Sequence, residues 1–93
     1  MKSRWVRCKV LPGMFSNEWL VVIEDSGEQE IASFLVDRSF VQVTEQPRQQ
    51  QPVIGKLLVD AGQAQTEGRV NVTLPVASGE VGRTVALPAG FLV

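Results

Sequence analysis

The sequence contains no histidine and no tyrosine, and it has a single cysteine. Histidine is the commonest metal ligand and the commonest general base, so its absence removes the side chain on which most hydrolytic and metal sites depend. Without histidine or a paired nucleophile, no catalytic triad can be assembled. We therefore expect a protein that is not an enzyme, with no catalytic residues, no metal site and no cofactor.

The single cysteine, Cys8, excludes an intramolecular disulfide, and a cysteine-based zinc site would need ligands that the chain lacks. Cys8 lies between Val6 and Val10 in a stretch that alternates apolar and polar residues. This position favours a small buried side chain over a reactive thiol, because reactivity needs exposure and a neighbour that lowers the pKa.

Long apolar runs are also missing. The longest run, from Trp19 to Ile23, is far too short to span a bilayer, and the basic start of the sequence is not followed by a signal-type apolar segment. The net charge of -1 gives no whole-molecule attraction to nucleic acid or anionic lipid. We expect a cytoplasmic protein that does not bind membranes.

Period-2 alternation is the dominant pattern, and no ten-residue window has the 3.6-residue period of a helix. In residues 4–10, Val6, Cys8 and Val10 fall on one strand face, and the stretch 70–76 alternates in the same way. The pattern predicts an all-β fold, a small antiparallel barrel or sandwich of six to eight strands. The β-branched run 19–23 predicts a strand covered on both faces. Met14 and Phe15 either fold back over a barrel mouth, which we favour, or present a contact surface.

A turn at Asp37-Arg38-Ser39 precedes the aromatic and aliphatic pair Phe40-Val41. This arrangement resembles the short helical turn before the final strand of Src-homology-3-like small barrels. The resemblance covers a handful of residues and implies a fold, without any function.

Two parts of the sequence follow the same plan. Each has a Ser-Gly-Glu turn, at 26–28 and at 78–80, then a short apolar strand and an aromatic-aliphatic pair, and residues 5–10 also align with 54–59. The plan predicts two tandem β-meander repeats, 4–43 and 53–93, joined by the glutamine- and proline-rich linker 44–52. The alternative is chance, since any two meanders with glycine turns align over short stretches.

Each half has about 40 residues and neither has a disulfide or metal site to stabilise it alone. We therefore expect the halves to share one core in a single domain, 1–93.

Basic residues gather at the start of the sequence around a tryptophan. On one strand face, tryptophan, arginine and lysine would offer a stacking surface and phosphate contacts, as in proteins that bind single-stranded nucleic acid. The candidate nucleic-acid-binding residues are Arg4, Trp5, Arg7 and Lys9. The alternative is cross-strand neutralisation by Glu24 and Asp25, at the end of the next strand region, and the near-zero net charge favours it.

The last three residues, Phe91, Leu92 and Val93, are apolar, with no charge or proline after Pro88. An apolar strand at a sheet edge offers unpaired backbone groups to a second copy, so these residues are predicted to form an oligomer edge. In the competing arrangement, Phe91 fills the barrel and only Val93 remains outside.

Taken together, the sequence favours a non-enzymatic small β-barrel that serves as an interaction or assembly module. Its partner would be another protein or a second copy of itself in a homo-oligomer. The alternative is a small barrel that binds single-stranded nucleic acid through its basic first strand.

Overall fold

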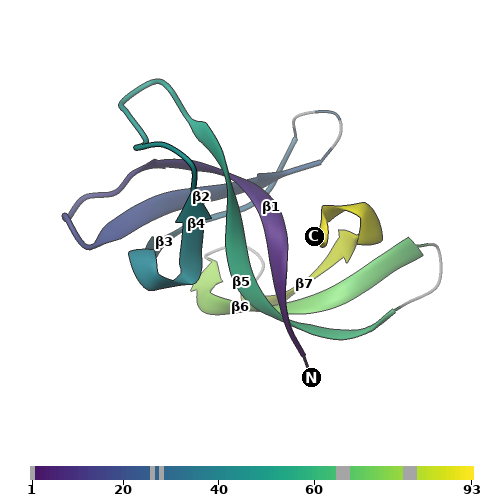
Figure 1. The fold of residues 1–93 in the computed structure, drawn as a ribbon. Helices are drawn as coiled ribbons and strands as arrows, with labels where there is room; N and C mark the ends of the chain where they lie inside the picture. Colours follow the sequence, from purple (N-terminus) through teal and green to yellow (C-terminus); the bar gives the residue numbers. More distant parts are fainter. Residues whose placement is uncertain (1, 26, 28, 65–67, 79–81) are drawn as a thin grey trace.

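The computed structural model describes residues 2–25, 27, 29–64, 68–78 and 82–93 (Figure 1). It is an all-β fold in which seven antiparallel strands form one strongly curled, half-barrel sheet. The predicted fold class and strand number are confirmed. In the described ranges, no helix is long and apolar enough to cross a membrane.

Seven strands and two 3₁₀ turns are assigned within the described ranges. In chain order they are β1 (Lys2–Pro12), β2 (Glu18–Glu24), β3 (Glu30–Asp37), η1 (Arg38–Phe40), β4 (Val41–Val43), β5 (Val53–Ala64), β6 (Arg69–Ser78), β7 (Gly82–Pro88) and η3 (Ala89–Phe91). The strand order across the sheet is β3-β2-β1-β5-β6-β7, and β4 adds to β5 outside this path.

Strands β1 and β5 form the centre of the molecule. They pair antiparallel from Lys2 opposite Ala61 to Val10 opposite Val53, and they cross the middle of Figure 1 side by side. On its other edge, β5 pairs first with β4 and then, further along, with β6. Both halves of the sequence are therefore attached to the same strand.

The two halves contain the same order of elements: three antiparallel strands, a three-residue 3₁₀ turn and a short extended segment. In each half this last segment crosses to the other half, since β4 pairs with β5 and Leu92 pairs with Val6 of β1. Buried side chains also correspond in position along the strands. The four pairs are Val21 and Val72, Ile23 and Leu74, Phe34 and Val85, and Val36 and Leu87.

This correspondence supports our interpretation of residues 4–43 and 53–93 as repeats, which remains a proposal. The first Ser-Gly-Glu turn is described only at Gly27, and the second only at Ser78; the remaining turn residues lie outside the described part. The linker 44–52 contains no strand or helix, but Arg48 and Gln51 form an isolated bridge.

The predicted turn after β3 is present as η1. The Asp37 side chain caps it by accepting a hydrogen bond of 2.9 Å from the Ser39 backbone N–H. Hydrogen bonding to the backbone and side chain of Ser39 lowers the pKa of Asp37. Asp37 therefore remains ionised when it caps the turn that directs the chain into β4.

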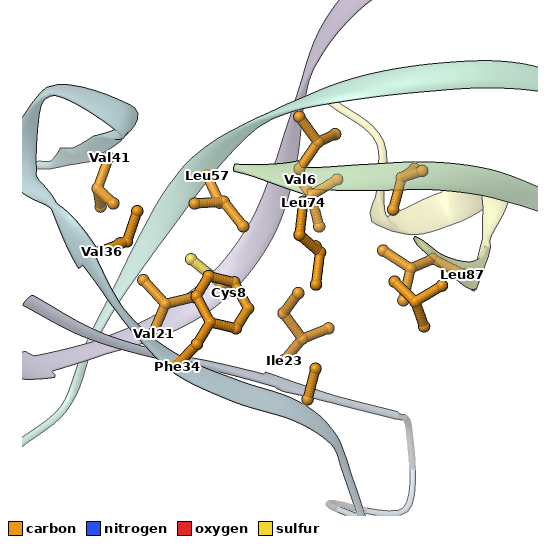
Figure 2. Close-up of a cluster of buried hydrophobic side chains, with 14 of the residues drawn as sticks. Val6, Cys8, Val21, Ile23, Phe34, Val36, Val41, Leu57, Leu74 and Leu87 are labelled. Carbon is orange, nitrogen blue, oxygen red and sulfur yellow. The ribbon is translucent and has the colours of Figure 1, made fainter. Parts of the chain in front are cut away.

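One hydrophobic cluster contains buried residues from both halves (Figure 2). Val6, Leu57 and Leu74 are fully buried in it. Cys8 is also buried, and desolvation raises the pKa of its thiol to about 12. The thiol therefore stays protonated at neutral pH and behaves as a small apolar side chain, as its position in the sequence predicts.

Two predictions about individual segments are wrong. Met14 and Phe15 do not fold back, since their side chains are 78% and 69% exposed. Pairing of β1 with β2 continues to Pro12 opposite Trp19, and β2 begins at Glu18, so the five residues 13–17 form the tip of this hairpin. Strand β2 lies between β1 and β3, but only alternate residues, Val21 and Ile23, are buried. Its other face is half-exposed because the half-barrel covers one side of the sheet.

Candidate binding groove

Three of the four basic-strand candidates share one face of β1. Trp5, Arg7 and Lys9 alternate with the buried Val6 and Cys8, so they occupy the outer face of the sheet. Arg7 is exposed, while Trp5 and Lys9 are half-buried. Arg4 is exposed, but along β1 it alternates with Trp5 and Arg7 and therefore lies on the opposite strand face from them.

Lys9 is engaged across the sheet. Its Nζ lies 2.6 Å from Oε1 of Glu24 at the end of β2. This is the cross-strand neutralisation that the sequence analysis favours. A partly exposed ion pair adds little stability, but it places a negative charge beside Lys9 and makes this lysine a poor phosphate contact.

Aromatic rings lie under two arginines. The Arg7 guanidinium carbon is 5.9 Å from the centroid of the Phe91 ring, so Arg7 bridges β1 and η3 through a cation–π contact. The guanidinium carbon of Arg38 lies 4.7 Å from the Trp19 ring centroid. The Trp19 ring face therefore already has a cation over it.

Arg7 lies directly opposite Lys56 in the β1–β5 pair, and both side chains are exposed. Neither forms an ion pair with an acidic residue among those that the structure describes. Like charges directly opposite on paired strands destabilise a sheet. The sequence analysis missed Lys56 as a site residue, although its alignment of 5–10 with 54–59 already superposes Arg7 on Lys56.

A groove of about 670 Å³ opens beside these cations. We call it the outer groove; it is lined by residues of β4, β5 and β1 together with Trp19, Thr44 and Val93. Ile54 and Val93 line it although their side chains are 61% and 60% exposed. Arg7 and Lys56 are the charged residues of its described lining. Exposed large apolar side chains beside a few polar groups are typical of a binding surface.

A smaller hollow of about 230 Å³ adjoins the outer groove and shares Arg7 and Ile54 with it. Its lining also includes Glu24 and Asp25. The outer groove thus has an acidic neighbour on its Lys9 side. No cluster of three or more potential metal ligands occurs within the part of the chain that the structure describes.

Residues 91–93 lie against β1. Leu92 forms a bridge with Val6, and the Val93 backbone N–H donates a 2.9 Å hydrogen bond to the carbonyl of Trp5. Phe91 is half-buried, with its ring against the core on one side and under Arg7 on the other, and Val93 is exposed. Self-association through these residues remains a prediction.

No protein-family model matches the chain, and no curated protein or solved structure matches it significantly.

Lys56→Glu is expected to stabilise the free protein by about 0.2 to 1 kcal/mol, because it replaces like charges with opposite charges across β1 and β5. The stability of Lys56→Gln should lie between that of Lys56→Glu and that of the original protein. Urea denaturation followed by tryptophan fluorescence measures the difference. Arg4→Glu is the matched control, since Arg4 lies opposite the apolar Val59. A less stable Lys56→Glu protein would mean that Lys56 has a favourable partner in the free molecule.

Proposed function

We propose that the protein is a non-enzymatic interaction module that holds a segment of a partner protein in the outer groove. The observation that carries this proposal is the groove of about 670 Å³, with Ile54 and Val93 exposed inside it. Apolar side chains at this exposure gain stabilisation from a partner that removes them from water.

An extended segment is the form of partner that suits this groove. The groove is lined by β4, β5 and β1, and at one level Gln42, Lys56 and Arg7 follow one another across these three strands. An extended segment that lies over β5 on this face can place alternate side chains against the lining and reach both cations.

Single-stranded nucleic acid is the less favoured ligand. Its binding would require a basic track with open aromatic faces, but Lys9 pairs with Glu24 and Arg38 lies over Trp19. Arg4 belongs to the other alternation of β1. With a net charge of -1, no wider positive field compensates for these losses.

The test is selection of a random heptapeptide library on the immobilised protein, followed by titration of the enriched peptides in solution. Ile54→Glu is expected to weaken binding about tenfold or more, because it places a charge on the apolar wall of the groove. Met14→Glu is the matched control, since Met14 is also exposed but lies at the β1–β2 tip. Both substitutions are at exposed positions and should leave the thermal transition nearly unchanged.

Failure to enrich any peptide over an unrelated protein would reject the proposal. If Met14→Glu abolishes binding and Ile54→Glu does not, the binding site is the tip and not the groove. A second copy of the chain is the other protein partner to consider. In that case light scattering would show a mass that rises with concentration, and Ile54→Glu would remove the rise.

A further inference from the structure

We infer that Arg7 and Lys56 form a seat for a carboxylate, so that the segment held in the outer groove carries an aspartate or glutamate between apolar residues. This inference rests on the proposed function and names the chemistry of its partner. Its starting point is the placement of two cations, directly opposite each other, in a groove whose other lining is mostly apolar.

The two cations form one site because of the strand register. Arg7 and Lys56 are direct partners in the β1–β5 pair and point to the same outer face. Opposite residues on paired strands have Cβ atoms about 4.5 to 5.5 Å apart, a span that a single carboxylate can bridge. One anion can therefore contact both side chains, and it removes the like-charge repulsion between them.

Arg7 is positioned for this contact before any ligand arrives. Its guanidinium lies 5.9 Å from the Phe91 ring centroid, which restricts the conformations of the side chain. The planar guanidinium can still donate two parallel hydrogen bonds to a carboxylate through its edge. An arginine held in place loses less entropy on binding than a free one.

Apolar surface lies next to the cations at the spacing of an extended chain. Ile54 is two residues from Lys56 on the same face of β5, a separation of about 6.6 to 6.8 Å. Side chains two residues apart in an extended ligand have the same spacing. An acidic residue over the cations would therefore place an apolar residue over Ile54.

The charges around the seat favour a single carboxylate over a polyanion. Arg7 and Lys56 are the charged side chains in the described lining of the outer groove, and that lining has no aspartate or glutamate. Beyond Arg7, however, the adjoining hollow contains Glu24 and Asp25. A chain of phosphates that continued along β1 would meet these carboxylates, whereas a protein segment with one acidic residue would not.

The experiment is a double-mutant cycle on peptides selected from the random heptapeptide library. For an enriched peptide, the acidic form and its Glu→Gln form are titrated against the original protein, Arg7→Gln, Lys56→Gln and Arg4→Gln. Arg4→Gln is the matched control, because Arg4 is a cation on the same strand outside the groove lining. Thermal unfolding of each variant checks that it is folded.

We expect the Glu→Gln change in the peptide to weaken binding to the original protein about tenfold or more. Arg7→Gln and Lys56→Gln should each weaken binding of the acidic peptide by a similar factor, yet leave the affinity for the Glu→Gln peptide within about twofold. Arg4→Gln should change neither affinity. The acidic peptide should also bind more weakly as salt rises.

Enrichment of peptides without an acidic preference, or an equal Glu→Gln effect in all variants, would overturn the carboxylate seat and leave the proposed function standing. Failure to enrich any peptide would instead reject the proposed function. A labelled dT₁₂ oligonucleotide is the last probe. If it binds as tightly as the acidic peptide, and Arg4→Gln weakens it as much as Arg7→Gln, the site is a nucleic-acid interface.

Discussion

Residues 1–46, produced alone, are expected to be unfolded or aggregated, with no cooperative thermal transition. In the structure, β4 pairs with β5, and β1 pairs with β5 along most of its length. The fragment does not contain β5, so two of its strands lose their partner. The fragment also loses Leu57, Val59 and Leu74 from the shared cluster. What remains buries too little apolar surface to offset the entropy of ordering about 40 residues.

Circular dichroism and a thermal scan of the fragment measure this directly. Residues 47–93 should behave in the same way, because β5 would then lack β1 and β4. Mixing the two fragments provides the control, since strand pairing between them should restore part of the β-sheet signal. A sharp, cooperative transition in either fragment alone would show that the halves do not depend on a shared core.

The strand faces could be predicted because alternation is a local property of the sequence. Val6, Cys8 and Val10 are buried as their period-2 pattern indicates, and so are Val70, Val72 and Leu74 in the alternating stretch 70–76. The turn at η1 could be predicted because a short polar side chain, Asp37, caps it from the preceding residue. Neither prediction needs information on which strands become neighbours.

The groove could not be predicted in the same way, because it depends on distant pairing. Ile54 joins Arg7 only through the β1–β5 register, and Val93 joins them only because residues 92–93 return to β1. The direction of the Met14 tip also depends on how far β1 and β2 stay paired. Loop closure and strand register are set by the whole fold, and single-sequence patterns do not contain them.

The cation pair links the repeat interpretation to the site. If the two halves derive from one unit, residues 5–10 correspond to 54–59, and Arg7 corresponds to Lys56. Antiparallel pairing of β1 with β5 then places this position opposite its own counterpart. A single basic residue in the ancestral unit would therefore have produced two facing cations after duplication. On this view the carboxylate seat is a product of the pairing and needs no separate origin.

Leu57→Ala is expected to destabilise the protein by about 2 to 5 kcal/mol, through lost burial and the cavity left behind. Leu57 is fully buried and lies opposite Val6 on one side of β5 and Val41 on the other. Figure 2 shows it between side chains of β1, β3 and β4. The free energy of unfolding of a typical domain is about 5 to 15 kcal/mol, so this substitution would remove a large share of it.

Leu58→Ala is the matched control, because Leu58 is the next residue of β5 but is half-buried on the outer face opposite Trp5. It is expected to lose about 1 kcal/mol or less. Urea denaturation followed by tryptophan fluorescence and by circular dichroism measures both variants. The two signals should shift together in Leu57→Ala, since fluorescence reports the first half and circular dichroism the whole sheet. Equal losses of unfolding free energy in the two variants would contradict a central role for Leu57 in the core. Separate transitions by the two signals would contradict a core that is shared by both halves.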